Sequence, residues 1–241
     1  MSSDAYSDLW TPFFHLFWHY WPDCPWRVYL GSEQRPFPDR RVTPLTAGHA
    51  QWSARLRFCL NQIDSDYVLL LLEDYFLDRA VSTPLLEEKL SLLARLSGGQ
   101  LRLFPLPGPD HKLAGYPALG TIDPRATYRV STQAAFWNRT HLSGLLVDSE
   151  PIWNFEWNAT NRSRSSNWAY YATYKPLLHY RQVIERGEWF RSAARHFGDR
   201  AIGCDFTARP VMSRRRALLR ALTTKLRYVK LRISAAVRSG Q

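Results

Sequence analysis

Two acidic residues, Glu73 and Asp74, directly follow an apolar run that extends from Tyr67 to Leu72. Adjacent carboxylates at the end of a buried strand supply hard oxygen ligands that hold a divalent cation, and such a cation would brace a diphosphate. Ligands of open α/β sheets bind at the carboxyl ends of strands, which is where this pair would lie. The alternative interpretation is that both acids end the strand in solvent.

Glu156 is the second candidate for chemistry, because three aromatic residues, Trp153, Phe155 and Trp157, flank it. Aromatic neighbours that exclude water favour the use of a carboxyl group as a general base. The alternative is a surface glutamate beside aromatic residues that are themselves buried.

Common catalytic signatures are missing from the sequence. It contains no GxSxG, GxGxxG or GxxxxGK[ST] motif, and the pair His15 and His19 lacks the glutamate of HExxH. The three cysteines are widely spaced and form no CxxC pair, which argues against a disulfide framework or a zinc site and fits a reducing cytoplasm.

The elements that must position the acids follow from hydrophobic spacing. The spacing predicts helices over 9–21, 49–63, 83–96 and 138–146, and strands over 26–31, 66–72, 101–104 and 128–135. Long loops are expected over 33–44, 105–124 and 158–167. Because strand 66–72 is apolar on both faces, we expect it at the centre of a sheet covered by helices on both sides, in an α/β fold.

Composition and charge divide the chain of 241 residues into a body and a tail. A hydrophobic fraction of 45% excludes a disordered chain, and no run of about 20 apolar residues is present to span a membrane. The net charge is +11, but ten Lys and Arg residues lie at or after Arg209 and no acid follows Asp205, which leaves +1 for residues 1–208. We expect a domain over 1–208 and a basic tail over 209–241. The first ten residues carry two Asp and no Lys or Arg, unlike a signal peptide, so we expect a cytoplasmic protein.

The tail has the pattern of an interfacial amphipathic helix. Its apolar face would hold Leu218, Leu222, Leu226, Val229, Ile233 and Val237, and its basic face Arg216, Arg220, Arg227, Lys230 and Arg238. We expect residues 214–238 to rest on an anionic membrane surface, peripherally on the inner face of the cytoplasmic membrane. The alternative is a helix docked on the body with its basic side in water.

Several segments together resemble small bacterial glycosyltransferase-like proteins of the GT-A fold, over about residues 3–157. They are SDAYSDLW (3–10), YWP (20–22), YLG (29–31), WSARL (52–56), YVLLLLEDYF (67–76) and WNFE (153–156). The resemblance implies a Rossmann-like sheet that binds a nucleotide-sugar at its carboxyl edge and passes the sugar to a surface-polysaccharide acceptor, which can be lipid-linked. In related proteins a first strand that forms part of the nucleotide pocket precedes this SDAYSDLW segment. The resemblance therefore implies either that the first strand lies upstream of the given start or that the donor site is incomplete.

The resemblance assigns roles to particular residues. Glu73 and Asp74 match the acidic motif that handles the donor diphosphate and a divalent cation, Mn²⁺ or Mg²⁺; because the motif is not Asp-x-Asp, a metal-independent site is the alternative. Glu156 matches the base of inverting members. The donor-binding set implied here is Asp4, Tyr6, Arg55, Glu73, Asp74, Lys112 and Arg139, and Trp153 and Trp157 are candidates to stack on acceptor sugars.

Two other functions compete with a transferase. A glycoside hydrolase also needs paired carboxylates, about 5 Å apart for retention or roughly 6.5–9.5 Å apart for inversion. A non-catalytic binding protein would use the basic tail, and a nucleic-acid partner would bind in a salt-dependent manner. That second alternative explains no feature before Arg209, so we expect no specific nucleic-acid partner.

Overall fold

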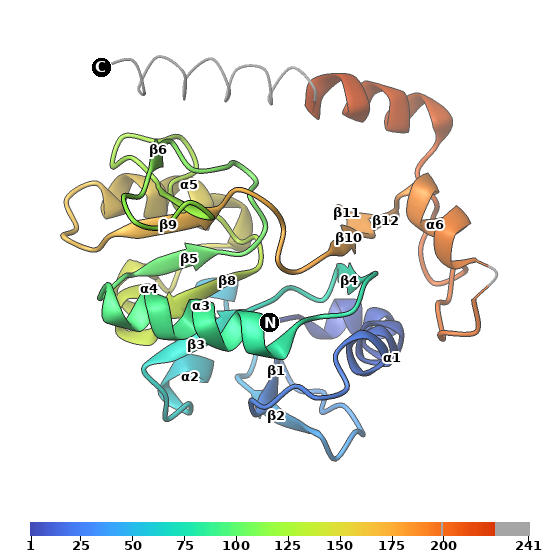
Figure 1. Cartoon of the computed structure of the whole chain (residues 1–241). Coiled ribbons are helices and arrows are strands. Elements are labelled where there is room, and N and C mark those ends of the chain that lie inside the picture. Colours follow the sequence, from blue (N-terminus) through green and yellow to red (C-terminus); the bar gives the residue numbers. More distant parts are fainter. Residues whose placement is uncertain (199, 225–241) are drawn as a thin grey trace.

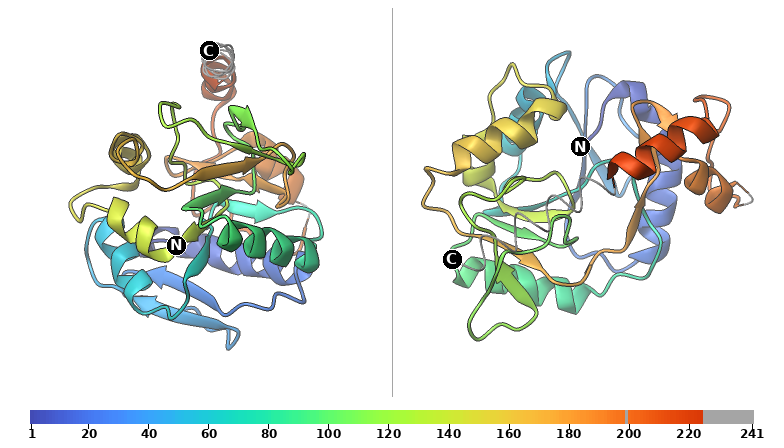
Figure 2. Two further views of the ribbon diagram at one scale, coloured as in Figure 1. Left: turned by 60° about the vertical axis from the view of Figure 1, so that its left-hand side comes forward. Right: turned by 90° about the horizontal axis from the view of Figure 1, so that it is seen from above.

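A six-stranded mixed sheet is the largest element of this α/β protein, for which a computed structural model describes residues 1–198 and 200–224 (Figure 1). In spatial order its strands are β3 (Tyr67–Leu70), β8 (Ala135–Asn138), β5 (Gln100–Arg102), β9 (Tyr170–Thr173), β7 (Leu119–Thr121) and β6 (His111–Lys112). β5 and β9 run parallel, whereas the other neighbouring pairs are antiparallel. Seen from above, α3 and α5 lie on opposite sides of this sheet (Figure 2).

Three smaller sheets complete the strand pairing. β1 (Val28–Ser32) pairs in parallel with β2 (Val42–Thr46), and β4 (Tyr75–Leu77) pairs antiparallel with β10 (Tyr180–Gln182). β11 (Ile184–Glu185) and β12 (Glu188–Trp189) form a hairpin. Its two turn residues, Arg186 and Gly187, both have positive φ angles, of 51° and 80°. Such a turn matches the twist of a two-residue hairpin and favours glycine.

Four of the helices form where the hydrophobic spacing predicts them, and η1 (Asp4–Leu9), α5 (Ile152–Ser163) and α6 (Arg191–Phe197) were not predicted. The four are α1 (Trp10–Tyr20), α2 (Trp52–Asn61), α3 (Thr83–Arg95) and α4 (Arg139–Leu145). The predicted helices over 9–21, 49–63, 83–96 and 138–146 are confirmed to within a few residues at their ends. In α1 the phenylalanines 13, 14 and 17 are buried, and Pro12 lies in the first turn, where its missing N–H costs nothing.

Several loop and strand predictions are wrong. The loop expected over 33–44 contains the start of β2, the loop over 105–124 contains β6 and β7, and α5 continues to Ser163 inside the loop expected over 158–167. The strand expected over 128–135 begins only at Ala135, because residues 128–134 follow the surface of α5 instead: Val130 N donates to Thr160 Oγ1. The strand over 66–72 is the edge of the six-stranded sheet and not its centre.

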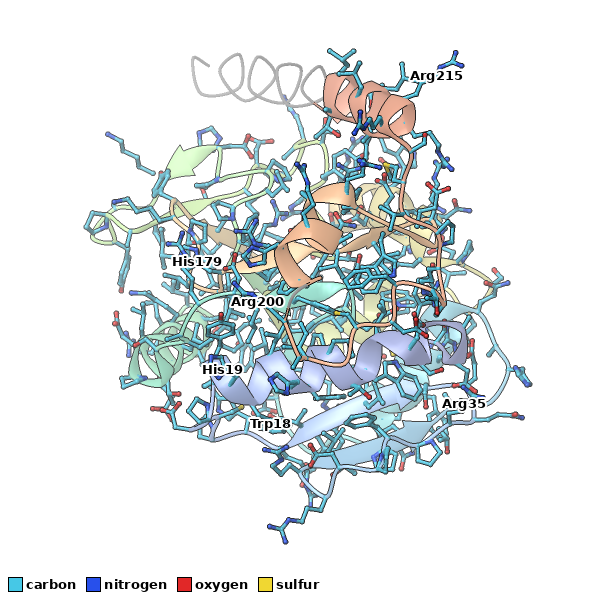
Figure 3. All side chains as sticks on the ribbon, turned by 90° about the vertical axis from the view of Figure 1, so that its right-hand side faces the viewer. Trp18, His19, Arg35, His179, Arg200 and Arg215 are labelled. Atoms are coloured by element: carbon cyan, nitrogen blue, oxygen red, sulfur yellow. The ribbon has the colours of Figure 1, made fainter. Side chains whose placement is uncertain are left out.

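The start of the basic tail belongs to the body of the protein. Arg209 forms an ion pair with Asp8 at 2.7 Å, and Met212 is buried and donates its backbone N–H to the carbonyl of Trp189. Residues 214–224 are helical, and Figure 3 shows Arg215 on this helix pointing away from the body. Residues 225–241, with most of the predicted amphipathic pattern, lie outside the described residues. Within the described part of the chain, no helix has the length and apolarity that crossing a membrane would require.

Candidate functional site

A cleft of about 560 Å³ lies where β3 ends and collects most of the predicted site residues. Its lining includes residues 1–3, Tyr6, residues 50–52, Arg55, residues 72–75, residues 131–133, the first turns of α5 with Glu156, Gln182 and residues 184–186. Glu73, Asp74 and Glu156 therefore share one cavity, although they come from distant parts of the sequence. Its volume is in the range typical of small-molecule sites.

The acid pair occupies a tight turn between two strands. β3 ends at Leu70 and β4 starts at Tyr75, whose N–H donates to the carbonyl of Leu72. β10 lies beside β4, and from it Gln182 Nε2 donates to Asp74 Oδ2 at 3.1 Å. Asp74 Oδ1 is buried and has no hydrogen-bond partner among the described residues. An unpaired buried carboxylate oxygen is costly, so this atom indicates a site for a proton or a cation.

The electrostatics of the pair agree with that interpretation. Burial raises the pKa of Asp74 to about 8, and the negative charge of Glu73 contributes to this rise. Burial also raises the pKa of Glu73, against the opposing charge of the Met1 amino group. Both pKa values are raised although the Met1 amino group lies near, so the pair favours a bound proton or a further positive charge.

Glu156 is held in place by the segment that precedes β8. Its Oε1 accepts from the hydroxyl of Ser131 at 3.2 Å, and from both the backbone N–H and the hydroxyl of Thr132, at 2.7 and 3.0 Å. On the same helix, Phe155 is buried against Trp52, with ring centroids 5.1 Å apart, which fixes the rotation of α5 about its axis. None of these donors reaches Oε2, which leaves this oxygen for a ligand.

The two tryptophans beside Glu156 in the sequence, Trp153 and Trp157, do not enclose it. Their side chains are 67% and 57% exposed, and the groups that bond to the carboxylate are the hydroxyls of Ser131 and Thr132 and the Thr132 N–H. Trp153 lines the cleft. Trp157 does not line the cleft; it lies four residues further along α5, about one turn of the helix.

Of the predicted basic residues, the structure brings one to the cleft. Arg55 is buried at its wall, where Nη1 donates to the carbonyl of Ser2 at 2.5 Å and Nη2 lies 3.6 Å from Glu33 Oε1. Lys112 is exposed on β6 and does not line the cleft. Arg139 lies at the opposite end of β3, where its guanidinium donates to the carbonyls of residues 65 and 60.

Asp4 and Tyr6 have different positions. The Asp4 carboxylate accepts from the backbone N–H groups of residues 33, 34 and 35, at 3.1–3.3 Å, and so shapes the loop after β1 without lining the cleft. Tyr6 lines the cleft, and the Arg209 guanidinium lies 4.4 Å from the centre of its ring. The predicted donor set is therefore divided: Tyr6, Arg55, Glu73 and Asp74 meet at the cleft, and Asp4, Lys112 and Arg139 do not line it.

Sequence reasoning missed several residues at the site. Arg186, at the tip of the β11–β12 hairpin, lines the cleft, and so does Arg220 from the helix over 214–224. Arg220 Nε donates to Glu185 Oε2 at 2.5 Å, and its guanidinium packs 4.0 Å from the ring centre of Phe190. Gly187 is the one turn residue of this hairpin that the sequence marks, and no local pattern indicates that the hairpin lies at the same cleft as Glu73.

The described residues include no group of three His, Cys, Asp or Glu side chains that could hold a metal ion. Among the acidic side chains, Glu73 and Asp74 are therefore the two that would hold a cation at the cleft. Mg²⁺ is commonly bound in this way: one or two carboxylates hold the ion, and substrate phosphates and water complete its coordination shell. The orphaned Asp74 Oδ1 and the raised pKa of both acids fit such a cation.

In comparisons with known proteins, no family model, no curated protein and no solved structure matches the chain.

Proposed function

We propose that the protein is an inverting glycosyltransferase, which moves a sugar from a nucleotide-sugar donor to a surface-polysaccharide acceptor. The observation that carries the proposal is the convergence of the acid pair and Glu156 on one cleft at the end of β3. The motifs that resemble GT-A-fold proteins supply these same three acids, so the Rossmann-like GT-A arrangement is part of the proposal.

The donor diphosphate would lie beside Glu73 and Asp74. Bound there, a divalent cation would neutralise the phosphate charge and help the nucleoside diphosphate to leave. Arg186 and Arg220 line the same cleft and add positive charge next to the β11–β12 hairpin. If no metal is used, these guanidinium groups are the ones that would hold the diphosphate.

Glu156 would act as the base. Three hydrogen bonds to Oε1 hold the carboxylate in place, and Oε2 would accept the proton of an acceptor hydroxyl. The deprotonated oxygen attacks the anomeric carbon while the bond to the diphosphate breaks on the opposite face, which inverts the configuration. Trp153, exposed at the rim, offers a flat surface on which an acceptor sugar stacks.

A glycoside hydrolase is the second candidate, and one observation favours it. With a pKa of about 8, Asp74 carries a proton at neutral pH and so has the property of a general acid, in the same cleft as the carboxylate of Glu156. Such a pair is what an inverting hydrolase needs. In a transferase the same proton is displaced when the cation and diphosphate bind.

The helix over 214–224 supports a membrane-associated acceptor. Leu218, Leu219 and Leu222 are 64%, 54% and 52% exposed, and Arg214 and Arg215 are exposed beside them. Apolar and basic side chains together bind anionic lipid surfaces, where each basic residue contributes about 1 kcal/mol. Because residue 220 of this helix also lines the cleft, the cleft would open close to the cytoplasmic leaflet and to a lipid-linked acceptor.

The decisive experiment compares three chains: the parent, Glu156→Gln and Glu87→Gln. Glu87 is an exposed acid on α3, so its replacement is the same chemical change away from the cleft. A panel of nucleotide-sugars is first screened by thermal shift with and without Mn²⁺, and turnover is then measured with the donor that binds.

We expect Glu156→Gln to keep donor binding and to lose at least about 100-fold in turnover, because the shape stays and the proton acceptor is removed. Glu87→Gln should match the parent. If Glu156→Gln turns over within a few-fold of the parent, Glu156 is not the base. Cleavage of glycosides in the absence of any nucleotide-sugar would establish the hydrolase instead.

A further inference from the structure

A second cavity separates the β1–β2 pair from the six-stranded sheet. It is an apolar groove of about 470 Å³, bounded by β1 on one side and by β3 on the other. Among the described residues β1 pairs only with β2 and β3 only with β8, and no strand lies between them. Figure 1 shows β1 and β3 as neighbours next to the chain's N-terminus.

Both strands turn open backbone groups toward this groove. Gly31 O accepts from Ser2 N at 2.8 Å, and because successive residues of a strand alternate between its two edges, Tyr29 and Gly31 face the groove. On the other side, Leu71 O accepts from the Met1 amino group at 2.8 Å. Leu69 lies two residues before Leu71, so the same alternation turns its backbone groups toward the groove.

Residues Met1 and Ser2 thus already join the two edges. Each of the two bonds is made at the carboxyl end of its strand, Gly31 for β1 and Leu71 just beyond β3. A chain that arrives at Met1 from within the groove would therefore run parallel to both strands, with Ser2 as its last paired residue.

The groove is built to cover a strand on both faces. A Cβ on Gly31 would point at Cys59 Sγ of α2, at 2.8 Å, so the neighbouring Leu30 points to the opposite face. Side chains of α1, among them Phe13 and Phe17, also line the cavity. A strand buried on both faces is apolar at nearly every position.

The composition of β3 makes the same point. Strand edges that stay open in water carry charges, prolines or bulges that prevent association, yet residues 67–72 read Tyr-Val-Leu-Leu-Leu-Leu. Such a sequence is typical of a central strand, and in the described chain it forms an edge. The groove explains the conflict, because one more strand would make β3 central.

We propose that the groove accepts a parallel β-strand of about five residues, supplied by polypeptide joined to the amino side of Met1. Five residues match the length of β1 and span about 17 Å. With this strand in place, the β1–β2 pair and the six-stranded sheet become one continuous sheet. The strand also fixes Ser2, whose carbonyl Arg55 holds at the wall of the cleft. This inference is independent of the reaction proposed above.

The test uses the full chain in three forms. The first is the chain as given, and the second has the segment Lys-Val-Ile-Val-Val-Leu fused before Met1. The third, the control, has the segment Lys-Val-Pro-Val-Pro-Leu at the same place. Proline has no N–H to donate, so the control cannot pair with both edges. Thermal melting and hydrogen exchange resolved to single amides are measured for each.

We expect the apolar extension to raise the melting temperature by at least about 5 °C and to slow exchange at the amides of Tyr29, Gly31 and Leu69 at least about tenfold. The proline form should behave as the unextended chain. Equal stabilisation by the proline form, or stabilisation without protection of these three amides, would overturn the proposal. Equal protection by the free peptide added to the unextended chain would overturn the assignment to a joined segment in favour of a partner strand.

Discussion

Replacement of Asp74 by asparagine tests the electrostatics of the acid pair directly. Burial and the charge of Glu73 raise the pKa of Asp74 from 3.8 to about 8 in the folded protein. At about 1.36 kcal/mol per pKa unit, ionising this group costs on the order of 5 kcal/mol more in the folded than in the unfolded chain. The folded state holds a proton between about pH 4 and pH 8 that the unfolded state has lost, so the group's contribution to stability is complete below about pH 4 and is lost as the pH rises through about 8.

The asparagine side chain carries no charge at any pH, so Asp74→Asn should remove much of this loss. The two carboxyl groups titrate as a coupled pair, so Glu73 keeps part of the cost of ionisation in the variant. We therefore expect about 3 kcal/mol of the ionisation penalty to disappear. At roughly 2–4 °C per kcal/mol, the variant should melt about 6–12 °C above the parent at about pH 9 and close to it at about pH 4. The matched control is Asp23→Asn, an exposed aspartate outside the cleft, which should follow the parent at both pH values.

The assay is thermal melting from about pH 4 to pH 9, in EDTA and in Mn²⁺. In EDTA the parent should lose stability as the pH rises and the variant should not. Mn²⁺ should restore the parent at the alkaline end, because a cation replaces the proton, and should leave Asp74→Asn nearly unchanged. Two results together would refute the argument that burial and Glu73 hold a proton on this carboxyl group: a parent whose melting temperature stays level or rises across this range, and an Asp74→Asn variant that is no more stable at the alkaline end.

Two further predictions concern the positive groups around the cleft. Arg186→Ala should raise the KM for the nucleotide-sugar roughly five- to 20-fold with little change in melting temperature, because Arg186 lines the cleft from a hairpin turn. Steady-state kinetics measures the KM, and Arg181→Ala, outside the cleft, is the control. An unchanged KM would show that the hairpin takes no part in donor binding. Truncation after Ser213 should abolish co-sedimentation with anionic vesicles and leave residues 1–213 folded, since residues 209–212 pack on the body. Neutral vesicles should sediment little of either form, and equal binding of both forms to anionic vesicles would place the membrane contact elsewhere.

Local sequence signals determined helices α1, α2, α3 and α4 and the position of the acid pair, but they did not predict α5. The aromatic spacing of α1 and the proline and glycine signals around α3 act within a few residues, and both helices form where those signals predict them. Glu73 and Asp74 follow an apolar strand in the sequence, and the structure places them in the turn at its end. These features depend on backbone propensity and periodicity, which a sequence carries by itself.

Tertiary structure decided which side chains meet. Lys112 and Arg139 have the right charge for a diphosphate, but strand pairing carries them away from the cleft, while the β11–β12 hairpin brings Arg186 to it. Ser131 and Thr132 give no signal of their own and become the donors that hold the base only because α5 packs beside them. Such contacts depend on distant segments packing around one core, and a residue's own neighbours in the sequence do not encode them.

The strand over 67–72 separates the two levels most clearly. Its uninterrupted apolar side chains predict that both of its faces are buried, and the sequence alone gives this prediction. Which backbone pairs with its two edges is a property of the assembled sheet: β8 occupies one edge, and the apolar groove beside β1 lies along the other. Side-chain burial is encoded position by position, whereas the edge of a strand is satisfied only by another segment of backbone.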